Sequence, residues 1–256
     1  MGTAASIRVG VGGWTYEPWR NNFYPAGLPH NRELRYASER LTAVEVNGTF
    51  YSTFGPSTFA KWRDETPEAF VFCIKAHRST TNRRELATAG EAIARFLNSG
   101  LSELGAKLGP ILWQFMPTKQ FAPEDFAGFL RLLPAELGGL RLRHVLDVRH
   151  PTFEDPRYLD MARSHGLTTV HTDSPKYPNI ADEQAPFAYL RLMRSEPQRE
   201  TGYAPEALRD WARGARAWAG GSSGRDAYVF FINGAKERAP AAATAFLETL
   251  HTAQQE

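Results

Sequence analysis

Polar and charged residues lie near the ends of several short apolar segments of this sequence. In LTAVEVNGTFY (41–51), Glu45 interrupts an apolar run, and Asn47, Thr49 and Tyr51 follow it. A carboxylate in such a run needs an ionic partner or a polar cavity, because burying its charge alone costs several kcal/mol. Comparable positions elsewhere hold Lys75, His77, Gln114, Asp147, Arg149, His171, Asp173, Arg191 and Asn233.

These residue types suit proton transfer on an anion. Arginine binds phosphate and carboxylate groups through paired hydrogen bonds, and a neighbouring carboxylate can accept a proton. We therefore predict an anion-binding pocket for a small anionic molecule. The predicted catalytic residues are Glu45, Lys75, Asp147, Arg149 and Asp173. The predicted substrate-binding residues are Asn47, Thr49, Tyr51, Gln114, Arg191, Asn233, Trp14 and Tyr16.

Each of these residues also has an alternative interpretation. Glu45 with Lys75, or Asp147 with Arg191, would form structural ion pairs inside a barrel. The aromatic residues Trp14, Tyr16, Trp19, Tyr51 and Trp113 would stack on a sugar or base, or only pack beneath loops. A divalent metal ion, the one cofactor considered, would use Glu45, Asp147, His171 and Asp173. The nearby cations would compete for those carboxylates, and no compact ligand motif such as H-E-x-x-H is present.

Eight short apolar segments read as β-strands that are covered on both faces, as in a parallel sheet. They span residues 7–13, 42–47, 70–76, 109–115, 143–149, 167–173, 187–193 and 226–233. Helix-like segments lie between them, at 31–41, 56–65, 84–105, 122–137, 155–166, 204–221 and 239–255. Only the turn-rich stretch 174–186, between the sixth and seventh strands, lacks a helical pattern.

This alternation predicts an α/β fold, a (β/α)₈ barrel of the TIM type, with an open doubly wound sheet as the alternative. Active sites of such barrels lie at the carboxyl ends of the strands, where the polar residues above would meet. We expect a single domain over residues 1–256, with its core at about 7–252. The glycines of GVGGW (10–14) lack dinucleotide-binding spacing, which favours close packing at a strand end.

Composition is that of a globular protein, with 42% hydrophobic residues and a net charge of +2. The near-neutral charge argues against nucleic acid as a partner, and the short basic run RLRH (141–144) reads as solvated surface. No segment is apolar and long enough to cross a membrane, and no signal peptide is evident. The lone cysteine, Cys73, reads as a core residue and fits a reducing, cytoplasmic location.

Several blocks of the sequence together resemble the YecE-like family (DUF72), a TIM-barrel domain of unknown function. They are GVGGWTYEPW, FYPAG, AVEVNGTFYSTF, FVFCIKAHR, LGPILWQFMP, LDVRHPTF and FFINGAKERAPAAA, in the family's order from residue 7 to about residue 250. The resemblance implies a barrel distantly similar to sugar isomerases and epimerases. Its motifs add Phe50 and His150 to the residues named above, and His150 is expected to bind substrate.

The sequence departs from the family pattern at two places. The family's seventh strand continues as an arginine followed closely by His-Gly, whereas this chain has YLRLMRSE. The family's Ile-Thr-His after the third strand is STTN (79–82) here. If either histidine transfers the proton in the family, the activity of this chain is altered.

The leading functional hypothesis is an enzyme that moves a proton on a small anionic, sugar-like or phosphorylated compound, as isomerases and epimerases do. Lys75, Arg149 and Arg191 would hold the anionic group, while Glu45 or Asp147 would move the proton. The alternatives are a metal-assisted phosphoester hydrolase and a non-catalytic binding protein for an anionic metabolite or a nucleic acid end.

Overall fold

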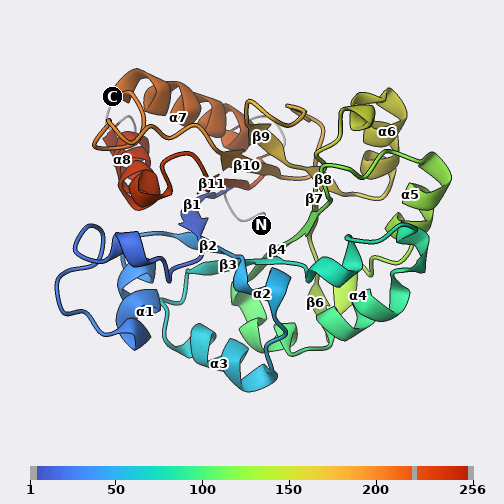
Figure 1. Cartoon of the computed structure of the whole chain (residues 1–256), viewed down its shortest axis with the longest axis horizontal. Coiled ribbons are helices and arrows are strands. Elements are labelled where there is room, and N and C mark those ends of the chain that lie inside the picture. The colour runs from blue at the N-terminus through green and yellow to red at the C-terminus, as the bar shows by residue number, and fades with distance from the viewer. Residues whose placement is uncertain (1–4, 221–223, 253–256) are drawn as a thin grey trace.

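Nine β-strands of the described chain form a ring with helices around it (Figure 1). The computed structural model describes residues 5–220 and 224–252. The strands are β1 (Ile7–Gly12), β2 (Ala43–Val46), β3 (Val71–Lys75), β4 (Leu108–Gln114), β7 (His144–Asp147), β8 (Thr168–Thr169), β9 (His171–Asp173), β10 (Ala188–Leu192) and β11 (Ala227–Phe231). All eight predicted strands are confirmed, and the sixth consists of two parts, β8 and β9.

The divided sixth strand closes the ring. The sheet order is β8-β7-β4-β3-β2-β1-β11-β10-β9, and every neighbouring pair is parallel. Only Val170 separates β8, which pairs with β7, from β9, which pairs with β10. The two ends of the sheet therefore belong to one continuous stretch of chain. The barrel prediction is confirmed over the open-sheet alternative.

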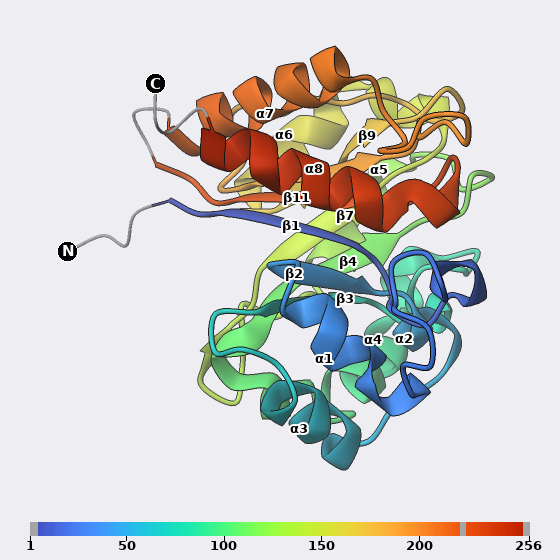
Figure 2. The ribbon, with the colours of Figure 1, turned by 90° about the vertical axis from the view of Figure 1, so that its left-hand side faces the viewer.

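The helices cover the outside of this ring, and Figure 2 shows the strands from the side. They are α1 (Glu33–Ser38), α2 (Gly48–Tyr51), α3 (Pro56–Asp64), α4 (Gly90–Leu97), α5 (Pro123–Leu130), α6 (Pro156–Ser164), α7 (Pro205–Gly220) and α8 (Ala239–Thr252). The stretch 174–186 has no helix, as predicted. Residues 221 and 253–255 of the two last predicted helices lie outside the described residues. No helix of the described chain has the length and apolarity of a membrane span.

Three predicted helices are much shorter than expected, among them α1 (Glu33–Ser38) within the predicted 31–41. The segment 84–105 contains α4 and short 3₁₀ turns, because Gly100 adopts φ 124°, a conformation outside the helical region. The segment 122–137 ends its helix at Leu130. Pro134 cannot continue a helix, and the chain instead forms a hairpin of β5 (Glu136–Leu137) and β6 (Leu140–Arg141).

Alternating residues of each strand divide the core into two layers. One layer lies between the strands and the helices. The other fills the barrel interior and consists of Ala43, Val71, Cys73, Leu112, Val145, Val170, Phe187, Tyr189, Tyr228, Phe230 and Ile232. The interior is therefore a packed core rather than a pore, as in other barrels of this class.

The glycines of GVGGW serve packing, as the sequence suggested. A Cβ atom at Gly10 would lie 2.0 Å from the carbonyl oxygen of Ala43 on the neighbouring strand. Gly13, just beyond β1, has φ 77°, which favours glycine. These residues bring β1 close to β2 and turn the chain at the strand's exit.

Candidate active site at the carboxyl ends of the strands

Arg191 joins two buried carboxylates inside the barrel. Its Nε and Nη2 donate to the two carboxylate oxygens of Glu45, both at 3.0 Å. Its Nη1 donates to Oδ2 of Asp147 at 2.8 Å, and Tyr189 adds a hydroxyl donor to Glu45 at 2.9 Å. These charged side chains are at most 2% exposed. The predicted Asp147–Arg191 ion pair is therefore present.

The positions of these residues in their strands explain why Arg191, Glu45 and Asp147 lie close together. Glu45 in β2, Asp147 at the end of β7 and Arg191 in β10 all face the barrel interior near the strands' carboxyl ends. Burial opposes the charge of Arg191, but the carboxylates of Glu45 and Asp147 hold its pKa above the usual value. Burial, together with the charge of Glu45, raises the pKa of Tyr189, which therefore stays a hydroxyl donor.

Arg149 lies above this network and is more accessible, with 11% of its side chain exposed. Its Nη2 donates to Oδ2 of Asp147 at 3.0 Å and to Oε1 of Gln114 at 2.7 Å. Its guanidinium carbon lies 4.5 Å from the ring centroid of Tyr177. Nη1 of Arg149 has no hydrogen-bond partner among the described residues. The guanidinium is thus held in place with donors remaining.

Lys75 is the third cation of the cluster and has no ionic partner in the described chain. Its amine lies 4.1 Å from the ring centroid of Phe50, and the Glu45–Lys75 ion pair of the alternative, structural interpretation is not formed. Burial lowers the pKa of Lys75 to about 8, and the positive charge of Arg191 contributes. The carboxylates of Glu45 and Asp147 oppose this effect only in part.

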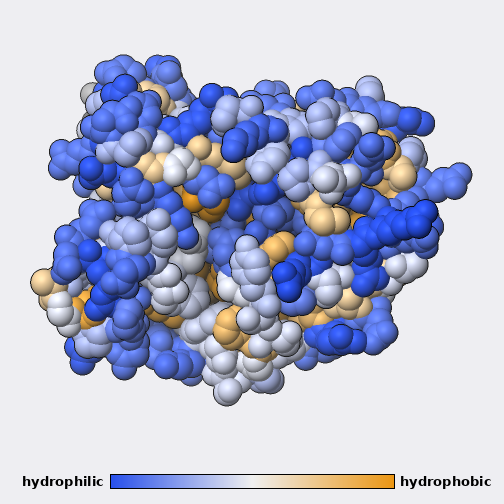
Figure 3. Space-filling view, viewed as in Figure 1, coloured by the Kyte–Doolittle hydropathy of each residue, from blue (hydrophilic) through white to orange (hydrophobic). Residues whose placement is uncertain are grey.

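Asp147 also retains unused hydrogen-bonding capacity. Its Oδ1 is buried and has no partner among the described residues, whereas Oδ2 accepts from Arg191 and Arg149. Leaving such an atom without a donor costs free energy, so it is available to a donor group of a ligand. Figure 3, which looks onto this end of the barrel, shows a recess near the centre of the face with hydrophilic residues in it.

The sixth strand does not contribute as expected. His171 faces outward, where its ring lies 5.6 and 5.4 Å from those of Trp211 and Trp218 in α7, and burial lowers its pKa. Asp173, on the same side of the strand, accepts a hydrogen bond from Nε of Arg194 at 2.7 Å. Thr172 takes the inward position between them and is buried.

This orientation separates the four residues considered for a metal ion. Glu45 and Asp147 share Arg191, whereas His171 and Asp173 face away from them. Within residues 5–220 and 224–252, no group of three or more His, Cys, Asp or Glu side chains could hold a metal ion. The donor set therefore does not fit a divalent metal at this place.

The residues after β2 mostly have structural contacts. Thr49 donates its hydroxyl to the carbonyl oxygens of Lys75 and Val46, at 2.7 and 2.9 Å, and so fixes the end of β3. Asn47 is half-buried beside Gly12. Tyr51 is 65% exposed, which places it on the outer rim.

Other predicted binding residues lie outside the charged cluster. Asn233 is exposed beyond the end of β11. Nδ1 of His150 accepts the backbone N–H of Thr152, and His77 does the same for Ser79. The ring of Trp14 packs on that of Trp62, and the ring of Tyr16 lies beneath the amine of Lys236. Trp19 and Trp113 are fully buried, which favours the packing interpretation.

Three contributors were not predicted. Tyr189 precedes Arg191 by two residues, so strand alternation would have placed it on the same face. Tyr177 comes from the turn-rich stretch 174–186, which has no periodicity to orient it. Thr81 lies in STTN (79–82), the segment that differs from the family pattern. It donates its hydroxyl to the carbonyl oxygen of Gln114 at 2.6 Å.

Comparisons with known proteins agree with the architecture. UPF0759 protein YecE of Escherichia coli (strain K12) is 27% identical over 150 residues, which are 57% of this chain and 50% of that protein. UPF0759 protein YunF of Bacillus subtilis (strain 168) is 25% identical over 169 residues, 62% of this chain and 56% of that protein. The chain thus spans about half the length of the curated relatives it matches.

Solved structures show the same fold. A DUF72 family protein from Thermotoga maritima has a TM-score of 0.74 at 22% identity, covering 98% of this chain and 100% of the other. One from Enterococcus faecalis has a TM-score of 0.75 at 17% identity, covering 96% and 95%. D-psicose 3-epimerase has a TM-score of 0.50 at 11% identity, covering 97% of each chain.

A family model described as "Protein of unknown function DUF72" matches residues 8–256. Since this match includes nearly the whole chain, the protein belongs to the DUF72 family.

Proposed function

We propose that this protein is an enzyme that moves a proton on a small anionic compound, sugar-like or phosphorylated, in an isomerase- or epimerase-type reaction. The observation that carries the proposal is the pair of incompletely bonded cations, Lys75 and Arg149, above a buried ionic network at the carboxyl ends of the strands. Barrel enzymes place their active sites at this end.

The charge of the cluster favours an anion. Lys75, Arg149 and Arg191 face the carboxylates of Glu45 and Asp147, which leaves one positive charge in excess when Lys75 is protonated. Asp147 and Gln114 orient the guanidinium of Arg149, and its free Nη1 would bind a phosphate or carboxylate oxygen. Arg191 is more constrained, because each of its three nitrogens already donates to Glu45 or Asp147.

Proton transfer is assigned to Lys75 with Asp147. An amine whose pKa is about 8 exists in both protonation states near neutral pH, which is the condition for general acid–base catalysis. The free Oδ1 of Asp147 would accept a hydrogen bond from the reacting group. Both oxygens of Glu45 accept donors from Arg191 and Tyr189, so we assign Glu45 to positioning rather than to proton transfer.

Likeness to D-psicose 3-epimerase supports this proposal as a fold analogy only. The metal-assisted hydrolase gains no support, because its intended ligands are dispersed. A binding protein for an anionic metabolite is the remaining rival, and it uses the same cations without turnover.

A metabolite screen by mass spectrometry tests the proposal, with wild-type protein and the Lys75→Met, Arg149→Gln and Lys61→Met variants. We expect conversion of an anionic compound by the wild type and by Lys61→Met, since Lys61 is an exposed residue of α3. Lys75→Met should bind that compound without converting it, and Arg149→Gln should bind it weakly. A ligand that stabilises the wild type against heat but remains unchanged would favour the binding protein instead.

A further inference from the structure

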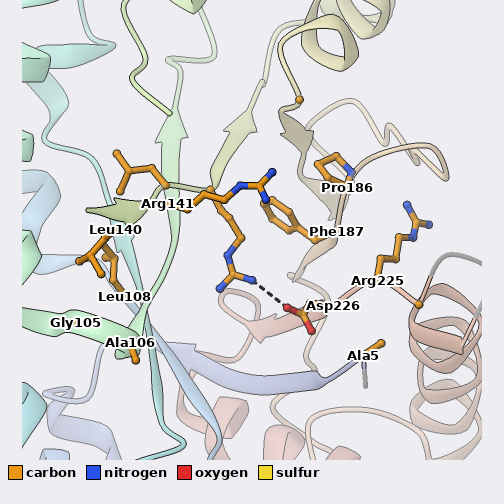
Figure 4. Close-up of a pocket in the computed structure, with 14 residues that line it drawn as sticks. Ala5, Gly105, Ala106, Leu108, Leu140, Arg141, Pro186, Phe187, Arg225 and Asp226 are labelled. Atoms are coloured by element: carbon orange, nitrogen blue, oxygen red, sulfur yellow. Dashed lines mark hydrogen bonds and ion pairs between the residues drawn. The ribbon is translucent and has the colours of Figure 1, made fainter. Parts of the chain in front are cut away.

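A second polar cavity lies at the opposite end of the barrel, where the strands begin. Its volume is about 470 Å³, within the range of small-molecule sites. Residues that precede β1, β7, β10 and β11 line it, among them Arg143, Phe187, Arg225 and Asp226. Figure 4 shows Arg141 and Arg225 on opposite sides of this cavity.

The basic run RLRH (141–144) supplies two of the arginines. In an extended chain, residues two apart share a face. Leu142 is buried, and Nδ1 of His144 accepts the indole N–H of Trp113, away from the barrel interior. Arg141 and Arg143 alternate with them and line the cavity. The expectation that this run is only solvated surface is therefore too simple.

Arg143 is fixed in orientation. Its Nη1 donates to Oδ2 of Asp226 at 3.0 Å, the contact drawn as a dashed line in Figure 4. Oδ1 of Asp226 accepts the backbone N–H and the hydroxyl of Ser6, at 3.0 and 2.8 Å. The guanidinium carbon lies 5.2 Å from the ring centroid of Tyr228 and 5.9 Å from that of Phe187.

These contacts leave one edge of Arg143 without a partner among the described residues, the edge formed by Nε and Nη2. This pair of donors matches the two oxygens of a carboxylate or phosphate. Arg141 is exposed, and its guanidinium likewise makes no ion pair within the described chain. Two arginines with free donors thus line one cavity.

The charge of the cavity also favours an anion. Arg141, Arg143 and Arg225 contribute three positive charges, and Asp226 contributes one negative charge, so two positive charges remain. Arg225 donates to the carbonyl oxygens of Ala185, Asp182 and Trp218. Arg225 therefore contributes positive charge and part of the cavity wall. The N–H donors that remain free for a ligand belong to Arg141 and Arg143.

We propose that this amino-terminal cavity binds a small molecule carrying a phosphate or carboxylate group, held by Arg143 and Arg141. The site is separate from the Arg191 network, which lies at the other end of the strands, and it does not depend on the function proposed above.

Isothermal titration calorimetry tests the site with inorganic phosphate and with propionate, at constant ionic strength. The titrations use protein that carries both Arg149→Gln and Lys75→Met, so that the two incompletely bonded cations at the other end of the barrel do not contribute. We expect at least one anion to bind. Adding Arg141→Gln or Arg143→Gln should weaken binding about tenfold or more, since a charged hydrogen bond is lost. The anion that binds with the higher affinity shows whether the ligand group is a phosphate or a carboxylate.

The matched control is Arg131→Gln, which removes the same charge from an exposed residue outside the cavity. It should leave the affinity unchanged. The side chain of Arg141 has no hydrogen-bond or ionic partner among residues 5–220 and 224–252, so Arg141→Gln remains informative even if Arg143→Gln fails to fold. The proposal is overturned if neither anion binds, or if Arg141→Gln weakens binding no more than Arg131→Gln does.

Discussion

Arg191 and Glu45 form a two-point ion pair inside the barrel, with both N–O distances at 3.0 Å and neither side chain exposed by more than 2%. Removing one partner would leave the other charge buried without compensation. We therefore expect Glu45→Gln to lower the free energy of unfolding by about 3–5 kcal/mol. Denaturant titration measures this change.

Glu39→Gln is the control for that measurement. Glu39 pairs with Arg35 on the surface, and both side chains are about half exposed or more. The control should change the free energy of unfolding by less than about 0.5 kcal/mol. Similar losses for Glu39→Gln and Glu45→Gln would show that the buried pair has no special importance for stability.

Lys75 should lower the free energy of unfolding of the protein at neutral pH. Its folded pKa of about 8 lies below the ordinary value of 10.5, so folding disfavours the charged amine. Lys75→Met should therefore stabilise the protein at pH 7, by on the order of 3 kcal/mol. Between these pKa values the unfolded chain binds more protons, so wild-type stability rises with pH and the advantage of the variant shrinks.

Denaturation at pH 7 and at pH 10 checks this prediction, with Lys61→Met as the exposed control. A difference between Lys75→Met and the wild type that is the same at both pH values would contradict it. A stabilised but inactive variant would show that the amine is retained for function and not for folding.

The amine of Lys75 should also differ from the other amines in its reactivity. Competitive labelling with acetic anhydride, read by peptide mass spectrometry, follows the neutral fraction of each lysine. Reactivity of Lys75 should rise with pH and reach half its maximum near pH 8, because burial beside Arg191 favours the neutral form. Lys61 should still be increasing above pH 9. The same pH dependence of labelling for Lys75 and Lys61 would contradict this prediction.

The two glycines around the end of β1 should respond differently to alanine. At Gly10 the new Cβ would lie 2.0 Å from the Ala43 carbonyl oxygen, so Gly10→Ala should cost about 3 kcal/mol or more. A Cβ atom added at Gly13 would have no atom within 4 Å among the described residues beyond its chain neighbours, and only the positive φ is unfavourable. Gly13→Ala should cost about 1–2 kcal/mol. Thermal denaturation of both variants ranks them, and the reverse order would contradict the packing interpretation.

Much of the fold could be predicted because buried parallel strands leave continuous apolar runs in the sequence. Helix lengths were less predictable. Helical periodicity continues past Gly100, but α4 ends at Leu97 and the backbone at Gly100 has a non-helical φ of 124°. The hairpin near Pro134 is held by the pairing of Leu137 with Leu140, an arrangement that competes locally with a helical pattern.

The candidate site was predictable only as far as strand orientation was. Glu45, Asp147 and Arg191 came together because each interrupts an apolar strand and faces inward. The sixth strand is polar and has no apolar pattern from which its inward face could be predicted. Asp173 was therefore predicted to face the barrel interior, whereas Thr172 does. The choice of partners depends on distances across the barrel, which no local pattern encodes. Lys75 and Glu45 illustrate this, because they lie on the neighbouring strands β3 and β2 but are not an ion pair.

The aromatic interior separates the two ends of the barrel and also connects them mechanically. Arg143 lies over Tyr228, whose ring stacks on Tyr189 at 6.1 Å, and Tyr189 in turn holds Glu45. Among the described residues, the barrel interior along this axis is filled by buried side chains. These contacts form a continuous path of packed side chains from the guanidinium of Arg143 to that of Arg191.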